Sequence, residues 1–233
     1  LELARLFSQN RYQNNRTFIF VALSGSNGSG SGAYTNWNRG SFDFISKHQE
    51  VKNDGILYID LNSIGGLGKR GILSTAERTV GFVRELADDM ELKERTEVRT
   101  GVNPRSDAFS FWFFGGVPFL SFSRTGSEPI TELSSQDVME ELSHDNFADD
   151  LKIAAMLLYR MDNKIVLPFV ISGDLLAIQK DIIASTAFFS PALKEKAAAA
   201  LKNFSELLQK IAKLENIMAK IFPKQELGNI INI

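Results

Sequence analysis

The stretch Gly55-Ile-Leu-Tyr-Ile-Asp-Leu61, which leads directly into Asn62-Ser-Ile-Gly-Gly66, decides the fold class. A short, nearly continuous apolar run with a polar, glycine-containing exit is typical of a strand buried on both faces of a sheet. Residues 17–23 and 117–122 form two more runs of this kind. Helical patterns lie between these runs, and strands that alternate with helices predict a layered α/β sheet, mostly parallel.

Helical periodicity is clearest over residues 75–90 and 147–161, where apolar residues recur at helical spacing. The chain also opens inside a helical pattern with no N-cap before it, which predicts a piece of a longer protein. From residue 174 onward the pattern is helical, and a second long helix begins at Ser190-Pro191 and runs to about 222. The sequence therefore predicts an α/β domain over residues 1–169 and a helical domain over 170–233.

Composition excludes several classes of protein. The 233 residues hold 26 Lys and Arg against 28 Asp and Glu, a net charge of -2, so a polyanion-binding surface and nucleic-acid binding are not expected. The absence of cysteine excludes disulfide scaffolds, thiolate zinc sites and cysteine nucleophiles. Only His48 and His144 are present, so any histidine-containing site must use one of them. No apolar run reaches the roughly 18 residues that cross a bilayer.

A Gly/Ser-rich loop follows the first apolar run. Its segment 28–33, Gly28-Ser-Gly-Ser-Gly-Ala33, fits the dinucleotide fingerprint G-x-G-x-x-A. The fingerprint expects an acidic residue about 20 positions further on, but Asp60, the candidate at a strand end, lies 32 positions after Gly28. A turning loop is therefore the favoured interpretation, and a nucleotide-binding α/β protein that uses this loop is kept as an alternative.

The acidic pairs and the aromatic cluster of the chain are assigned structural roles. Adjacent carboxylates on a helix point about 100° apart, so Asp88-Asp89 and Asp149-Asp150 are interpreted as solvated helix faces. The aromatic residues between 109 and 114 are expected to be core. His144 precedes a helix that it could cap.

Taken in order, several segments resemble the co-catalytic zinc aminopeptidase (M28-type peptidase) family. More narrowly, they resemble its branch that contains transferrin receptor and glutamate carboxypeptidase II. Residues 16–25 resemble the strand that leads into the family's Ser-Gly-Glu-Glu loop, and Ile59-Asp-Leu-Asn-Ser-Ile-Gly65 resembles its Ile-Asn-x-Asp strand. Ser106-Asp-Ala-Phe109 with Gly116-Val-Pro118 resembles its "Ser-Asp-x-x-x-Phe … Gly-(Ile/Val)-Pro" segment, and residues 163–169 resemble the junction before the branch's helical dimerisation domain.

This resemblance implies a three-layer α/β/α mixed sheet with a C-terminal helical appendage, and it implies that the metal site is degenerate. The family's paired glutamates fall on Ser26 and Asn27, its zinc-binding aspartate on Asn62, and its last zinc-binding histidine on Leu133, with His144 as the fallback ligand. The family's remaining ligands would precede Leu1. Neutral side chains cannot offset the charge of two zinc ions or activate a metal-bound water.

The leading prediction is therefore a pseudoenzyme that acts in recognition or assembly, without a cofactor. It is expected to form a homodimer through the helices of 174–222, because their apolar positions are too numerous for one small bundle. A protein or peptide partner is compatible with this prediction, a membrane anchor is expected only upstream of Leu1, and localisation stays open. The second alternative is an active zinc-dependent aminopeptidase or carboxypeptidase with relocated ligands.

Overall fold

The computed structural model describes residues 1–9, 13–24, 38–62, 64–75, 77–125, 142–163 and 171–221. The chain divides into two compact units, residues 1–163 and residues 164–233. Ser26, Asn27, the loop 28–33 and Leu133 lie outside the described residues.

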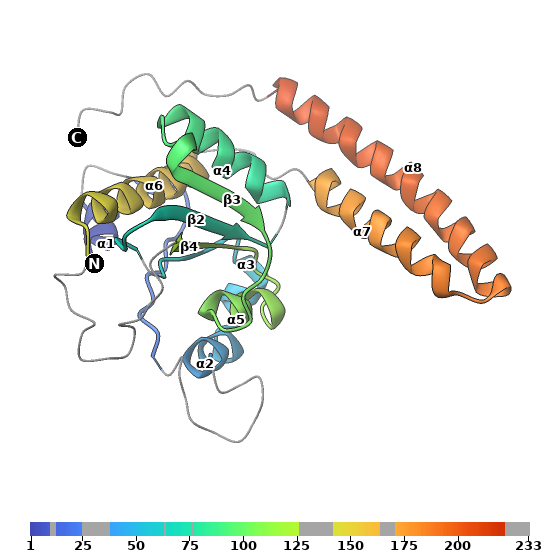
Figure 1. The fold of residues 1–233 in the computed structure, drawn as a ribbon, viewed down its shortest axis with the longest axis horizontal. Helices are drawn as coiled ribbons and strands as arrows, with labels where there is room; N and C mark the ends of the chain where they lie inside the picture. Colours follow the sequence, from blue (N-terminus) through green and yellow to red (C-terminus); the bar gives the residue numbers. More distant parts are fainter. Residues whose placement is uncertain are drawn as a thin grey trace. The chain divides into compact units, whose positions relative to one another are not determined.

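Within the described residues, the first unit is built on a four-stranded sheet in the order β1-β4-β2-β3 (Figure 1). The strands are β1 (Tyr58–Asp60), β2 (Lys69–Ser74), β3 (Thr96–Thr100) and β4 (Phe119–Thr125). β1 pairs with β4 and β2 pairs with β3 in parallel, whereas β2 and β4 are antiparallel. The sheet is therefore mixed, and the predicted α/β class is confirmed.

Helices cover both faces of this sheet and make three layers (Figure 1). One face carries α4 (Glu77–Asp89) and α6 (His144–Asn163), and the other carries α5 (Asp107–Phe113) with α2 (Arg39–Lys47) and α3 (Gln49–Asp54). The short helix α1 (Glu2–Phe7) and the single turn η1 (Lys93–Arg95) complete the described elements of the unit.

The main core lies between the sheet and the α4–α6 layer. The register aligns Ile72 of β2 with Phe122 of β4 and Val98 of β3, and all three side chains are buried. Residues that are paired in register on neighbouring strands point to the same face, so these three lie on one side of the sheet. The helices α4 and α6 contribute the buried residues Val80, Val83, Leu86, Ile153 and Leu157 to the core. A smaller core beneath α5 is built from Ile45, Phe111 and Val117.

The prediction of a buried strand at residues 17–23 is wrong. The segment has no strand conformation, and Ile19 and Phe20 are 58% and 48% exposed. Apolar composition favours burial, but a strand also needs a backbone partner, and residues 17–23 form no ladder with the described strands. The chain is held here by Arg16 instead, whose backbone N–H donates to Asp162 Oδ1 at 2.7 Å.

The other predicted elements of the first unit are confirmed with shifted ends. The run 55–61 contains β1 and the run 117–122 overlaps β4, while residues 75–90 and 147–161 correspond to α4 and α6. β2 and β3 were not expected from the sequence. Both begin with charged or polar residues and lack the continuous apolar run that marks a strand buried on both faces.

The second unit is a helical hairpin of α7 (Ile171–Ser185) and α8 (Pro191–Ile221), joined through the turn η3 (Thr186–Phe188) (Figure 1). The two predicted helices and the break between them are confirmed. Polar contacts hold the pair together: the Ser172 N–H donates to Glu215 Oε1 at 3.0 Å, and Gln179 Nε2 donates to Ser205 Oγ. No described side chain of this unit is buried.

Within the described residues, no helix combines the length and the apolar character needed to span a membrane.

Candidate functional site

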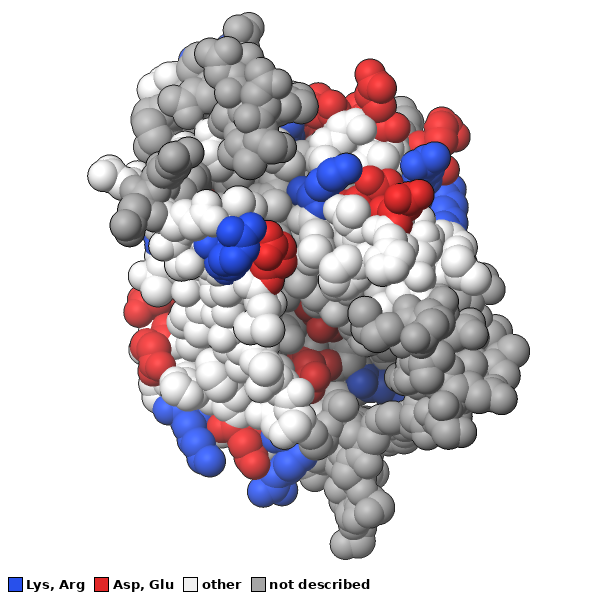
Figure 2. Space-filling view, turned by 90° about the vertical axis from the view of Figure 1, so that its left-hand side faces the viewer, with Lys and Arg blue, Asp and Glu red and all other residues white. Residues whose placement is uncertain are grey.

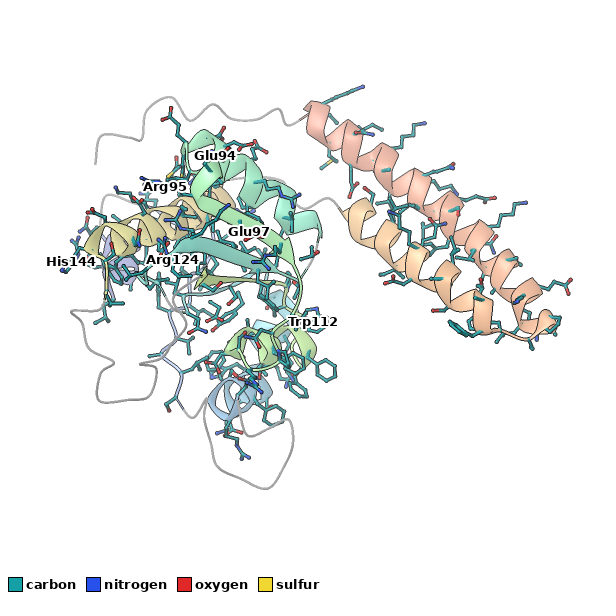
Figure 3. The ribbon with its side chains drawn as sticks, in the orientation of Figure 1. Glu94, Arg95, Glu97, Trp112, Arg124 and His144 are labelled. Carbon is teal, nitrogen blue, oxygen red and sulfur yellow. The ribbon has the colours of Figure 1, made fainter. Side chains whose placement is uncertain are left out.

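Several chain segments that carry polar residues meet at one edge of the sheet, the edge formed by the ends of the strands and not by an outer strand. β1 and β4 end at this edge, β2 begins there, and the loop 61–68 joins β1 to β2. The start of α6 is bonded to that loop, because the Ser143 N–H donates to the Gly65 carbonyl and Asn146 Nδ2 donates to the Gly66 carbonyl, both at 2.9 Å. Figure 3 shows His144 and Arg124 at this same end of the unit.

Two of the predicted site positions are described, and both lie at this edge. Asn62 stands in the turn that follows β1, and His144 is the first residue of α6. Both side chains are exposed, and no hydrogen bond joins them within the described part of the chain.

The described residues at this edge do not fit a pair of zinc ions. Zinc is held in proteins by imidazole, thiolate and carboxylate groups. Asn62 offers only a neutral amide where the family resemblance calls for a carboxylate. Across the described ranges, no three His, Cys, Asp or Glu side chains come together in a way that could hold a metal ion.

The best-defined polar structure at this edge is a buried ion cluster around Asp150, which we call the Asp150 cluster. Asp150 Oδ1 accepts from Arg70 Nε at 2.5 Å and from Arg124 Nη2 at 2.7 Å. Asp150 Oδ2 accepts from Arg124 Nε at 3.1 Å and from the Gly65 N–H at 2.9 Å. The side chains of Arg70, Arg124 and Asp150 are 2%, 4% and 2% exposed. The interpretation of Asp150 as part of a solvated face is therefore wrong.

The Asp150 cluster carries a surplus of positive charge, because two guanidinium groups share one carboxylate. Arg124 donates further to the Gly68 and Asn146 carbonyls at 3.1 and 3.0 Å, and Arg70 Nη1 donates to Thr96 Oγ1 at 3.1 Å. Arg70 Nη2 has no hydrogen-bond partner among the described residues. This atom is not among the fully enclosed polar atoms that lack a partner, so it can still donate to solvent or to a ligand in the cavity.

A cavity of about 520 Å³ opens beside the Asp150 cluster. Of the residues that line it, we call the nearly inaccessible Arg70 and Arg124 its base, and the more exposed Lys69, Arg95 and first turn of α6 its mouth. Three carboxylates also stand at the mouth, Glu94, Asp145 and Asp149. Figure 3 shows Arg95, Glu94 and Arg124 on the same side of the sheet as α6.

A second polar group lies on the opposite face of the sheet, under α5. Asp60 accepts a hydrogen bond from Ser121 Oγ at 2.9 Å, and the two residues are neighbours in the β1–β4 ladder. Burial raises the pKa of Asp60 to about 6, the Ser121 hydrogen bond opposes this rise, and the charge of Asp107 adds to it. Burial, with the charges of Asp60 and Asp107, also raises the pKa of Tyr58, whose ring stacks on Phe111.

Several buried polar atoms near α5 have no hydrogen-bond partner within the described ranges. They are Asn38 Oδ1, Ser106 Oγ, Asp107 Oδ1 and Ser110 Oγ. Each of these oxygens can accept a hydrogen bond, so a buried water would satisfy them.

The aromatic residues of α5 are core only in part, which corrects the sequence interpretation. Phe111 is buried against Tyr58, whereas Trp112 and Phe113 are 37% and 61% exposed. Figure 3 shows Trp112 projecting from α5, on the opposite side of the sheet from α4 and α6. A seven-residue helix in which four residues are aromatic, three of them consecutive, cannot turn all of them toward one neighbour.

The face shown in Figure 2 carries charges of both signs. On the face shown in Figure 2, Lys and Arg side chains alternate with Asp and Glu side chains, separated by uncharged areas. Among the described residues on that face, no large area of one sign appears.

Comparisons with known proteins give partial likenesses to solved aminopeptidase structures. An aminopeptidase from Aneurinibacillus sp. strain AM-1 is 19% identical with a TM-score of 0.44, over 58% of this chain and 34% of that chain. The LapA aminopeptidase of Legionella pneumophila is 15% identical with a TM-score of 0.44, over 57% of this chain and 38% of that chain. This chain therefore spans little more than a third of the length of either aminopeptidase. No protein-family model matches the chain, and no curated protein matches it.

Proposed function

We propose that this chain acts in recognition or assembly on a zinc-exopeptidase-like scaffold, and that it self-associates through the α7–α8 hairpin. The observation that carries this proposal is an apolar stripe on α8 that has no partner in the described structure. Its large members are Leu193, Leu207, Leu214 and Ile221, which are 47%, 52%, 61% and 59% exposed.

The stripe is distinct from the seam that holds the hairpin together. The half-buried apolar residues of α8 alternate three and four positions apart, as Ala197, Leu201, Phe204, Leu208 and Ile211. The hydrogen bonds from α7 reach Ser205 and Glu215 along this side. The exposed stripe recurs every seven residues beside the seam, with Ala200 in the one small position. A heptad spacing keeps such residues in line along the helix.

A second copy of the chain is the partner that this pattern supports. A helix in a four-helix bundle contacts two neighbours and therefore needs a wider apolar face than a helix in a two-helix hairpin. α8 has 31 residues and spans about 46 Å, long enough for two hairpins to bury the area that stable dimers need. Leu176 and Ile183 of α7 are also exposed and seven residues apart, which extends the unpartnered apolar surface to both helices.

The non-catalytic half of the proposal rests on charge. The positions that the family resemblance assigns to two glutamates and one aspartate hold Ser26, Asn27 and Asn62. None of these side chains can act as a general base or balance a divalent cation. The exposed amide of Asn62, at the end of β1, supports this assignment within the described residues.

The test is the mass of the full-length chain in solution, measured by light scattering after gel filtration. The wild type is expected to be a dimer, and the double variant Leu207→Glu/Leu214→Glu is expected to be a monomer, because it places four carboxylates in the dimer interface. Lys213→Glu is the matched control, since it adds a glutamate at an exposed position of α8 away from the stripe and should remain a dimer. A wild-type chain that stays monomeric at high concentration contradicts the proposal.

A further inference from the structure

We propose that the cavity beside the Asp150 cluster is a binding site for a small oxyanion, a carboxylate or a phosphate group. This inference concerns the first unit and is independent of self-association. It rests on the cavity, on the charge at its base and on donors that have no partner within the described structure.

The base of the cavity presents a net positive charge. Arg70 and Arg124 are both nearly inaccessible, and Asp150 neutralises only one of them. Arg70 Nη2 is the guanidinium nitrogen without a partner in the described ranges, and Arg70 lines the cavity. Planar guanidinium groups bind carboxylate and phosphate oxygens by charge-assisted hydrogen bonds. An oxyanion at this position would complete the pairing that a single carboxylate leaves incomplete.

The first turn of α6 supplies a second set of donors. The Phe147 N–H donates to the Ser143 carbonyl and the Asn146 N–H donates to Ser143 Oγ, so these two donors are used. The N–H groups of His144 and Asp145 have no partner among the described residues. Ser143 and Asp145 line the cavity, and the helix dipole places positive potential at this end of a 20-residue helix.

The mouth of the cavity limits the kind of anion that fits. Lys69 and Arg95 add positive charge there, but Glu94, Asp145 and Asp149 add negative charge. Asp149 lies 3.7 Å from both Arg95 and Lys152, which offsets its charge, whereas Glu94 and Asp145 have no cation beside them in the described part of the chain. A polyanion would be repelled at this mouth. A ligand with one oxyanion group and a neutral or cationic remainder suits both the cationic base and the partly acidic mouth of the cavity.

The experiment follows the guanidinium Nε–Hε signals of the full-length ¹⁵N-labelled chain by NMR. Sodium acetate, sodium phosphate and sodium chloride are titrated at matched ionic strength. Acetate or phosphate is expected to shift the Arg70 and Arg124 signals with saturation in the millimolar range, while chloride leaves them in place. The Arg160 signal is the internal control, because that side chain is also buried but does not line the cavity.

The outcomes separate the two sources of oxyanion and can also overturn the site. A response to acetate alone assigns a carboxylate ligand, a response to phosphate alone assigns a phosphate-bearing ligand, and a response to both assigns the shared chemistry. No saturable shift with either salt, or the same shift with chloride, refutes the proposal.

Variants locate the binding without disturbing the buried arginines. Arg95→Ala removes an exposed cation from the mouth and should weaken oxyanion binding roughly threefold. Arg99→Ala removes another exposed cation, on β3, that does not line the cavity, and it should leave binding unchanged. Equal binding by the wild type and both variants would place the anion elsewhere and sink the assignment.

Discussion

Asp60 of β1 and Asp150 of α6 show that two buried aspartates of one unit can have opposite environments. Asp150 receives two guanidinium groups and a backbone N–H. Asp60 receives the Ser121 hydroxyl, with Ser106 as a weaker hydroxyl contact, and faces a second carboxylate, Asp107. The pKa of Asp60 is therefore raised to about 6, and the charged form of this residue destabilises the fold.

This raised pKa predicts how stability depends on pH. The folded state holds the Asp60 proton more tightly than the unfolded chain does, so unfolding releases a proton between pH 3.8 and about 6, and stability falls as pH rises through that window. The loss amounts to about 3 kcal/mol. Asp60→Asn should remove this component, which is measured as the difference between wild-type and variant urea-unfolding free energies from pH 4 to pH 7.

A second substitution checks the cause. Ser121→Ala removes the hydrogen bond that favours the charged form of Asp60, so the fall in stability with rising pH should extend to higher pH and become larger in total. If the difference between the wild type and Asp60→Asn is flat across this pH range, the environment assigned to Asp60 is wrong.

At the scale of elements, the Asp150 cluster connects the start of β2, the end of β4, the loop 61–68 and α6. Asp150→Asn keeps the shape of the side chain but leaves two buried guanidinium groups without a charged partner. We expect it to lower the free energy of unfolding by about 3–5 kcal/mol. The neighbouring variant Asp149→Asn should cost less than about 1 kcal/mol, because Asp149 makes only long contacts with partly exposed cations.

Chemical denaturation of the two variants under identical conditions provides the measurement. They differ by one position on the same helix and remove the same charge, so a difference in helix propensity cannot account for a gap between them. Equal destabilisation would show that the Asp150 cluster contributes no more than a surface ion pair.

The elements that sequence reasoning found are those whose own pattern carries the information. Local sequence alone predicts the runs 55–61 and 117–122 and the helices of the second unit. Their apolar patterns can be recognised without knowing which residues they contact in the fold. β2 could not be found in this way, because its second residue is Arg70, whose burial depends on Asp150, 80 positions away. The prediction of a strand at residues 17–23 failed for the opposite reason, since this segment has apolar side chains but pairs with no strand in the described structure.

The site was harder to predict than the fold. A signal for Asp150 was nevertheless present, because it precedes Ile153, Ala154 and Leu157 by three, four and seven positions and so shares the buried face of α6. A carboxylate on an apolar helix face points to a buried cation. The cavity, in contrast, is formed by segments far apart in the chain, and no local sequence pattern predicts it.

At the scale of the whole molecule, the proposal predicts the metal content of the purified chain. Equilibrium dialysis of the full-length protein against micromolar zinc should leave less than one ion per chain, because Asn27 and Asn62 cannot replace carboxylate ligands. His144→Ala should not change the result, since an exposed lone histidine binds zinc weakly. Two tightly bound zinc ions per chain would overturn the non-catalytic reading and restore the active peptidase alternative.

The strand order β1-β4-β2-β3 bears on how the protein is made on the ribosome. β4 lies between β1 and β2, so the first two strands to emerge cannot pair with each other. β2 can join β3 as soon as both have been synthesised, but β1 must wait until the polypeptide has been extended through β4. A nascent polypeptide that stalls before residue 119 would thus expose unpaired backbone on both sides of the gap, where chaperones or aggregation compete with folding.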